Sequence, residues 1–579
     1  MKHTFSIWAA NPKQVELAIG GRRLPMKRSK GGGWNLVVQT PKPDEDYGYI
    51  LDGEGPFPDP RSPWQANGVH GQSRLVDHGE FTWTDAGFSA KPLSRAVIYE
   101  LHVGTFTPEG TFASAIAKLD HLVQLGITHV ELMPVAEFSG KHGWGYDGVA
   151  LFAPHEPYGG PAGLKQLVNA CHAHGLAVLL DVVYNHLGPS GNYLARFAPY
   201  FNDRYHTPWG WAVNFDGAYS DDVRRFFCDN ALMWLRDYHC DGLRLDAVHA
   251  IMDTSAKPFL EQLAEEVKQL AAQLERRLVL IAESDLNDPR LIRPAQQGGL
   301  SLDAQWSDDF HHALHAVLTG EHDGYYEDFA GLADLGKALQ QSYVYDGRYS
   351  CHRRRRHGRS PAGLGGHRFL AYAQNHDQIG NRAQGERLGH LVTLGRLKIA
   401  AALVLTAPFI PLLFQGEEWG ASSPFLYFTD HPEPDLGRAV RDGRRQEFAA
   451  FGWKPEDVPD PQARESFERS KLNWAELVTS SHQELLDWHR QLIQLRHTET
   501  TLTDGLLEAV AVRFDEAAQW LIVERGPITV ACNFARERQR LDLGAAPSPV
   551  LLASHPDIAA ASGQIELPPD SVVILKRAV

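Results

Sequence analysis

Two charged residues stand in the otherwise apolar stretch GLRLDAVHA, which covers residues 242–250. Side chains two positions apart point to the same face of a strand, so Arg244 and Asp246 are expected to lie side by side. Burying such a pair costs several kcal/mol unless its geometry is good. The pair is therefore either a structural ion pair or a carboxylate that is kept charged for chemistry.

Acids and histidines also stand at the ends of three other apolar stretches, which are DVVYNH (181–186), IAESD (281–285) and NHDQ (375–378). Two carboxylates in one cleft can split an acetal, because one attacks the anomeric carbon while the other protonates the leaving oxygen. The two carboxylates need different protonation states at one pH. We expect Arg244 to keep Asp246 ionised, and the apolar VLIA segment to raise the pKa of Glu283 by desolvation.

The central part of the chain alternates between apolar strand-like runs and amphipathic stretches such as 112–126, 161–175 and 256–274, as in parallel βαβ units. We predict eight strands, at residues 97–103, 127–133, 176–182, 242–247, 278–283, 300–306, 368–374 and 409–415. Eight such units predict an α/β fold, a (β/α)8 TIM barrel; a doubly wound sheet is the alternative, but no GxGxxG turn follows the first strand. Active sites in this fold lie at the C-terminal ends of the strands, where the four polar segments fall.

Short strands with period-two alternation, broken by proline and glycine, precede and follow this region, and they predict a β-sandwich at each end. We expect a carbohydrate-binding-like N-terminal β-sandwich at 1–90, a catalytic barrel with inserted loops at 91–500, and a C-terminal β-sandwich at 501–579. The run AALVLTAPFIPLLF (401–414) is interpreted as a buried helix end followed by a buried strand.

Composition excludes several classes of partner. The net charge of −15, from 56 basic and 71 acidic residues, disfavours nucleic acid and anionic membrane surfaces. Five scattered cysteines without a CxxC pair fit a reducing compartment. The N-terminal apolar patch is too short for a secretory signal, and the run 401–414 is too short to span a bilayer. We expect a cytoplasmic protein with no nucleic-acid or membrane partner, and an exposed loop at Arg353–Arg356.

Taken in order, the four polar segments resemble the signature segments of the α-amylase family. The resemblance covers the whole chain, since many members carry a β-sandwich before the barrel and another after it. It implies that Asp246 is the nucleophile and Glu283 the general acid/base. Asp377 is the implied third carboxylate, which binds sugar hydroxyls and stabilises the oxocarbenium-like transition state.

The same resemblance implies residues that hold the sugar in the reacting subsite. Arg244 matches the arginine beside the nucleophile, His186 and His376 match two sugar-binding histidines, and Tyr146 matches the tyrosine that stacks beneath the sugar. Many members hold calcium near the segment that contains Asn185, but the sequence shows no clear cluster of acids for it. We therefore expect no required metal and no cofactor.

Longer segments, including GWGYDGVALFAPH and NHDQIGNR, resemble the branch of the family that hydrolyses the α-1,4 bond between a terminal trehalose unit and a maltooligosaccharide. The expected partners are maltooligosyltrehalose and α-glucan oligosaccharides. Branching enzymes, the first alternative, usually have glutamine in place of Asp147, and serine and glutamate in place of Asn375 and Gln378. A non-catalytic α-glucan-binding protein is the second alternative, although such a protein has no reason to keep all three carboxylates.

We expect specificity to come from hydrogen bonds to the α,α-1,1-linked trehalose unit, which an uncapped chain does not reproduce. Candidate substrate-binding residues beyond those named above are Asp147, His249, Asp253, Asp308, Asp309, Phe310, His311, His312, Gln378 and Arg382. The alternative is that loop residues among them bond only to one another. Trp209 and Trp211 either stack on sugar rings or pack their own loop.

Overall fold

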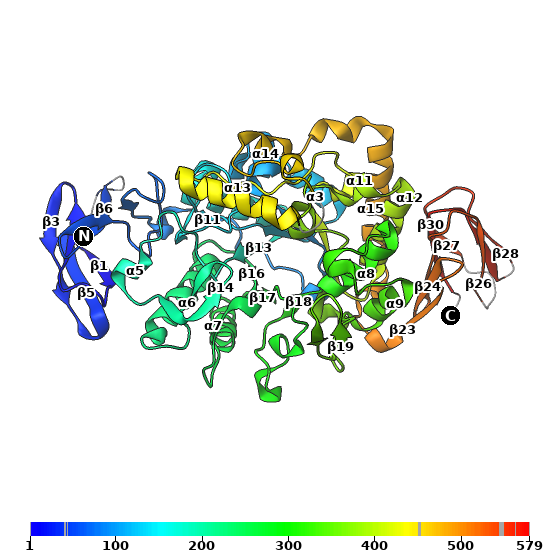
Figure 1. Ribbon diagram of the computed structural model, residues 1–579, viewed down its shortest axis with the longest axis horizontal. Coiled ribbons are helices and arrows are strands. Elements are labelled where there is room, and N and C mark those ends of the chain that lie inside the picture. Colours follow the sequence, from blue (N-terminus) through cyan, green and yellow to red (C-terminus); the bar gives the residue numbers. More distant parts are fainter. Residues whose placement is uncertain are drawn as a thin grey trace.

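A closed barrel of eight parallel strands forms the centre of the computed structural model, which describes residues 2–39, 42, 45–449, 453–543, 549–561 and 563–577 (Figure 1). Neighbouring strands follow the chain order and close between the last and the first. They are β9 (Ile98–Leu101), β10 (His129–Leu132), β13 (Ala177–Val182), β16 (Gly242–Leu245), β17 (Val279–Ala282), β18 (Ala304–Trp306), β21 (Phe369–Ala371) and β22 (Ile410–Phe414). The predicted barrel and its eight predicted strands are confirmed.

The barrel strands form because they are apolar on both faces, as parallel strands covered by helices must be. Every residue of β13, with the sequence AVLLDV, is buried. Gly242 allows β16 and β17 to pack closely, because a Cβ at this position would lie 2.5 Å from Cγ2 of Val279. Strand packing thus explains the glycine that opens the GLRLDAVHA segment.

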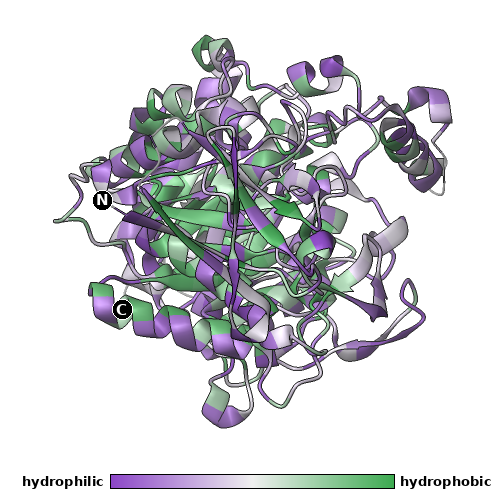
Figure 2. Cartoon of the chain, turned by 90° about the vertical axis from the view of Figure 1, so that its left-hand side faces the viewer, coloured by the Kyte–Doolittle hydropathy of each residue, from purple (hydrophilic) through white to green (hydrophobic). Residues whose placement is uncertain are grey.

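Helices surround the barrel, and hydrophobic residues are concentrated inside this shell (Figure 2). The longer ones are α4 (Gly160–Ala173), α6 (Ser220–Arg236), α7 (Phe259–Leu274), α8 (Asp308–Thr319), α9 (Leu332–Gln341), α12 (Leu394–Thr406), α13 (Pro434–Ala449) and α15 (Ser480–Thr498). Shorter helices are α1 (Val103–Phe106), α5 (Leu194–Phe197), α10 (His376–Gly380), α11 (Leu388–Leu391) and α14 (Arg464–Arg469). The stretch 112–126 forms two helices rather than one, α2 (Phe112–Ile116) and α3 (Leu119–Leu125).

Antiparallel sheets flank the barrel at both ends of the molecule (Figure 1). The N-terminal strands are β1 (Lys2–Trp8), β2 (Val15–Ile19), β3 (Arg22–Pro25), β4 (Lys27–Arg28), β5 (Gly33–Gln39), β6 (Asp46–Leu51), β7 (Glu54–Phe57) and β8 (Ser73–Arg74). The C-terminal strands are β23 (Val510–Asp515), β24 (Trp520–Arg525), β25 (Ile528–Asn533), β26 (Gln539–Asp542), β27 (Val550–Ala553), β28 (Ala559–Ala561), β29 (Gln564–Leu567) and β30 (Ser571–Lys576). The precise domain limits remain a prediction.

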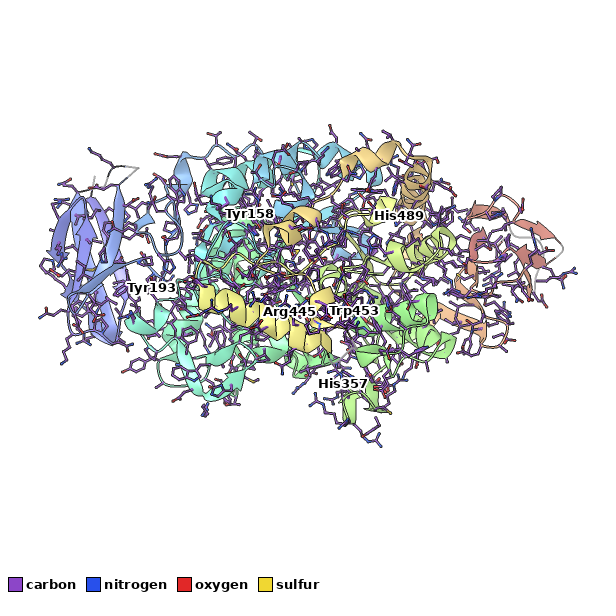
Figure 3. All side chains as sticks on the ribbon, turned by 45° about the horizontal axis from the view of Figure 1, so that its top comes forward. Tyr158, Tyr193, His357, Arg445, Trp453 and His489 are labelled. Carbon is purple, nitrogen blue, oxygen red and sulfur yellow. The ribbon has the colours of Figure 1, made fainter. Side chains whose placement is uncertain are left out.

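Aromatic contacts attach the N-terminal sheets to the barrel. Tyr193 lies at this junction (Figure 3). The centroid of its ring lies 5.2 Å from that of Phe57, and its hydroxyl is hydrogen-bonded to His70 Nδ1. Three hairpins outside the barrel sheet were not predicted: β11 (Ala136–Glu137) with β12 (Ala150–Pro154), β14 (Phe201–Thr207) with β15 (Gly210–Val213), and β19 (Asp346–Ser350) with β20 (Arg355–Gly358). Two of them, β14–β15 and β19–β20, carry residues that reach the site described below.

The apolar run 401–414 forms the end of α12 and the whole of β22, as predicted. Where the structure describes the chain, no helix combines the length and the hydrophobicity that a bilayer span requires. The turn between α12 and β22 is held by Arg496 on α15. This residue is 2% exposed, and its guanidinium donates to the carbonyl oxygens of Leu405, Ala407 and Phe409. The charge of Arg496 thus satisfies the free carbonyls at the end of α12.

Replacement of Arg496 by methionine should lower stability, because three buried carbonyl oxygens then lose a charged donor, at a cost of about 3 kcal/mol or more. Calorimetry should show a lower midpoint of thermal unfolding for Arg496→Met. The control is Arg490→Met on the same helix, where the side chain is 34% exposed and, among the described residues, pairs only with Asp487. Equal midpoints for the two variants would contradict the assigned role of Arg496.

Candidate active site

One buried guanidinium lies at the centre of the cleft formed by the strand ends. Arg244, on β16, is fully buried, and its Nη1 donates to Asp246 Oδ1 at 2.7 Å and to both carboxylate oxygens of Asp181 at 3.0 Å. Its Nη2 lies 3.8 Å from Glu283 Oε2. Its guanidinium also lies over the rings of Trp306 and Tyr146, 4.5 Å and 6.0 Å from their centroids. Arg244 therefore joins carboxylates from three neighbouring strand ends.

Asp246 is held from two sides at the end of β16. In addition to the bond from Arg244 to Oδ1, Asn185 Nδ2 donates to Oδ2 at 2.6 Å. Burial opposes the charged form, but Arg244, His186 and Asn185 outweigh it and keep the pKa of Asp246 below its usual 3.8. Asp246 is therefore a carboxylate in a fixed orientation near neutral pH.

Glu283 has the opposite electrostatic setting, directly after β17. Burial, followed by the charges of Asp246, Asp308 and Asp377, raises the pKa of Glu283 well above its usual range, against the effect of Arg244. Its Oε2 accepts a 2.5 Å bond from the backbone nitrogen of Ala247. Ala247 has a φ of 38°, a left-handed conformation that is costly for a residue with a Cβ and typical of functional sites.

A chain of hydrogen bonds continues from Arg244 through Asp181 to the other side of the barrel. Tyr146 Oη donates to Asp181 Oδ2 at 2.6 Å and lies 2.8 Å from His376 Nε2. His376 Nδ1 lies 2.5 Å from Glu100 Oε1. Burial raises the pKa of Asp181 to about 7, whereas Glu100 and Asp377 outweigh burial at His376 and raise its pKa to about 9.

Other residues expected in the reacting subsite surround these groups. Asp377, in the first turn of α10, keeps a side chain that is 43% exposed. His186 is 6% exposed, and its Nε2 bonds to the carbonyl oxygen of Tyr146 at 2.9 Å. The ring of Trp209, on the loop between β14 and β15, stacks on His186 with 4.5 Å between centroids. Asp147 lies 3.8 Å from His431.

A cavity of about 260 Å³ opens beside Asp377 and Asp308. Asp308, Asp309, His312 and Gln378 line it, among the candidates expected to bind the trehalose unit. Gln378 Nε2 donates to Asp308 Oδ1 at 3.4 Å, while its Oε1 is buried without a partner. His249 lies at the same side of the cleft, 3.9 Å from Asp285.

Five of the expected substrate-binding residues are packed against, or hydrogen-bonded to, other parts of the protein. Asp253 accepts from Arg224 and from the backbone nitrogen of Phe259, and so fixes the start of α7. Asp309 accepts from Asn287 and from the backbone nitrogens of Val344 and Tyr345.

Phe310 is fully buried, His311 bonds to Ala373 and Tyr326, and both guanidinium ends of Arg382 bond to Glu321. Asp253, Phe310, His311 and Arg382 thus have partners within the protein, and their part in sugar binding stays a prediction. Packing and ion pairs account for these side chains. Asp309 borders the cavity but uses Oδ2 to hold the loop at Val344.

Sequence reasoning missed several residues around the cavity. Arg353, expected on an exposed loop, is only 24% exposed and pairs with Asp285 at 2.9 Å, whereas Arg354, Arg355 and Arg356 are exposed as predicted. The β19–β20 hairpin that carries Arg353 is anchored by His357 (Figure 3), which bonds to the carbonyl oxygen of Asp285. Asp285 stands within the quoted IAESD segment, so its position at a strand end was a usable signal.

Asp181 and Glu100 were also missed. Asp181 opens the DVVYNH segment, and Glu100 is an acid within the otherwise apolar first strand, where its charge was the available signal. Both are buried at the strand ends. They connect the predicted carboxylate cluster to His376.

The surroundings of Asn185 do not fit a calcium ion. Its amide oxygen faces His186 Nδ1 and its amide nitrogen donates to Asp246, so neither atom is free to coordinate a metal. Within the described ranges, no group of three or more histidine, cysteine, aspartate or glutamate side chains is arranged to hold a metal ion.

A charged carboxylate beside a carboxyl with a raised pKa is the arrangement that acetal cleavage requires. Comparisons with known proteins point the same way. A family model described as alpha amylase, catalytic domain, matches residues 80–217, and a model described as a domain of unknown function (DUF3459) matches residues 505–574.

The chain is also similar to curated proteins and solved structures over most of its length. A malto-oligosyltrehalose trehalohydrolase of Mycobacterium tuberculosis is 50% identical, over 92% of this chain and 93% of that protein. One from Rhizobium sp. (strain M-11) is 49% identical, over 99% and 97%. A crystal structure from Salmonella typhimurium aligns with a TM-score of 0.92 and 39% identity, over 100% of this chain and 98% of that one. The chain belongs to the malto-oligosyltrehalose trehalohydrolase family.

Proposed function

We propose that this chain is a retaining glycoside hydrolase that cleaves the α-1,4 bond next to the terminal trehalose unit of maltooligosyltrehalose and releases trehalose. The observation that carries the proposal is the opposite setting of two carboxyls around Arg244. Asp246 is kept charged by a 2.7 Å contact with the guanidinium, whereas burial favours the protonated form of Glu283. A nucleophile and an acid thus stand ready at one pH.

In the first step, an Asp246 oxygen forms a bond to the anomeric carbon of the maltooligosyl unit. The bond from this carbon to the leaving oxygen breaks, and Glu283 gives its proton to that oxygen, so that trehalose leaves as a neutral alcohol. The proposed role of Asp377 is to bind hydroxyl groups of the reacting sugar. Its exposed side chain at the open side of the cleft suits this role.

In the second step, the ionised Glu283 takes a proton from water, and the water oxygen attacks the anomeric carbon. The bond to Asp246 breaks, and the maltooligosaccharide leaves with its original anomeric configuration. Arg244 stabilises the carboxylate of Asp246 before attack and again after release. No proton needs to reach Asp246 at any point of this cycle.

We further propose that α-glucan chains bind along the cleft and that the trehalose unit occupies the cavity beside Asp308. His249, His312 and Gln378 are the candidates with side chains at this cavity or its rim, and Arg353 and Asp285 join them. Transfer to form branches is less well supported, because Asp147, Asn375 and Gln378 replace residues usual in branching enzymes. A cytoplasmic location stays a prediction, and the five free cysteines are compatible with it.

The roles of Asp246 and Glu283 can be separated with α-maltosyl fluoride, because fluoride leaves without a proton. Glu283→Gln should lower kcat on maltooligosyltrehalose by about 10²–10⁴-fold. On the fluoride, the same variant should form the glycosyl-enzyme, which added azide converts to α-maltosyl azide. Asp246→Asn should form no glycosyl-enzyme, and azide should yield only the β-azide. The anomers are identified by NMR. A β-azide from Glu283→Gln, or an α-azide from Asp246→Asn, would contradict the assigned roles.

Substrate choice should follow the trehalose cap. Two or three hydrogen bonds lost with an uncapped chain, at about 1–2 kcal/mol each, predict a preference of a hundredfold or more for the capped chain. The test compares kcat/KM on maltooligosyltrehalose and on the uncapped maltooligosaccharide of equal length, with trehalose measured as product. Equal values on the two substrates, or new α-1,6 branches in amylose, would contradict the proposed function.

A further inference from the structure

His376 has a hydrogen-bond partner within the protein at each ring nitrogen. Nδ1 lies 2.5 Å from Glu100 Oε1, and the backbone nitrogen of His376 donates to Glu100 Oε2 at 3.1 Å. Nε2 lies 2.8 Å from Tyr146 Oη. Both side chains of the His376–Glu100 pair are at most 2% exposed. Glu100 has no contact with Asp246 or Glu283 among the hydrogen bonds and ion pairs of the described residues.

The direction of the hydrogen bonds follows from counting protons. Tyr146 Oη has one proton, and Asp181 Oδ2, 2.6 Å away, is an acceptor because Arg244 donates to both oxygens of Asp181. Tyr146 therefore donates to Asp181, and His376 Nε2 must donate to Tyr146. Since Glu100 is an acceptor, Nδ1 also donates, so His376 carries a proton on both nitrogens.

We propose that Glu100 is a positioning residue that holds His376 in its doubly protonated form and thereby fixes the direction of every hydrogen bond from His376 through Tyr146 to Asp181. In this arrangement the charged groups alternate in sign: Glu100 is negative, His376 positive, Asp181 negative, Arg244 positive and Asp246 negative. The alternative arrangement moves one proton to Asp181, beside the positive charge of Arg244, and makes His376 Nε2 an acceptor. The effect on hydrolysis rests on the function proposed above.

The surroundings of His376 support this assignment. Seven charged or titratable groups face it, and these are Glu100 (β9), Glu131 (β10), Tyr146 (the loop after β11), Asp181 (β13), Arg244 (β16), Asp377 (α10) and, more distantly, His102 after β9. Burial lowers the pKa of His376, but the carboxylates, Glu100 first, raise it to about 9, above the value of about 7 for Asp181. The shared proton therefore belongs on His376.

The neighbouring strand offers a matched control. Glu131 pairs directly with Glu100 in the register of β9 and β10, and it is equally buried at 1% exposure. Its Oε2 has no hydrogen-bond partner, and burial followed by the charge of Glu100 raises its pKa well above the usual value. Burial and the neighbouring Glu100 thus favour the uncharged form of Glu131, so glutamine should replace it without altering the charge near His376.

The direct test is the pKa of His376 in full-length protein with ¹³C-labelled histidine. One of the 28 histidine signals is assigned through its loss in His376→Gln. In Glu100→Gln the pKa of His376 should fall by about 1–3 units, because a close opposite charge is removed. In Glu131→Gln it should stay at the wild-type value. An unchanged pKa in Glu100→Gln, or an equal fall in both variants, overturns the proposal.

The pH profile of hydrolysis gives a second readout. Glu100→Gln should lose about tenfold or more of kcat/KM at pH 8 and regain it toward pH 6, as His376 takes up its proton. A merely structural role would lower activity by one factor at every pH, and that result overturns the proposal. If Glu100→Gln does not fold, Glu100→Asp should keep the pKa of His376 above that of a free imidazole. Because NMR titration needs no substrate, a wild type that releases no trehalose contradicts only the proposed function.

Discussion

The site depends on the way in which one buried positive charge is shared. Arg244 is the only cation within hydrogen-bond reach of Asp181 and Asp246 among the described residues, and it also lies near Glu283. A buried guanidinium and several buried carboxylates are each costly alone, and together they are tolerated only if every charge has a partner. Bonds and charges from Arg244, His186 and Asn185 keep Asp246 charged, whereas burial favours the protonated form of Glu283.

The barrel supplies the positions that this sharing requires. β13, β16 and β17 are neighbours in the sheet, so Asp181, Asp246 and Glu283 arrive at one level around Arg244. Gly242 allows β16 and β17 to pack closely, and the left-handed Ala247 turns its backbone nitrogen toward Glu283. Side chains on strands keep such a geometry better than side chains on long loops, because neighbouring strands fix their direction.

The sequence was most informative where strand periodicity and charge coincide. Arg244, Asp246, Glu283 and Asp377 each follow or interrupt an apolar strand, and the order of the strands brings them together. The cavity residues were harder to predict, because their positions depend on partners distant in sequence. Asp253 accepts a hydrogen bond from Arg224 on α6, and Arg353 pairs with Asp285 because the β19–β20 hairpin carries it there. Spacing along the chain contains no signal for either pair.

The substitution Arg244→Met tests the shared charge most directly. Without the cation, the folded-state pKa of Asp246 rises from below its usual value and that of Asp181 rises further above about 7, so the stability deficit relative to the wild type is small near pH 4 and grows as pH rises toward 8. We predict that calorimetry across this range shows such a widening difference from the wild type, together with a loss of activity at pH 7 of about a hundredfold or more. Arg276→Met, which removes a pair with Asp241 remote from the cleft, should lower stability but keep activity. A pH-independent deficit for Arg244→Met with near wild-type turnover would contradict the account.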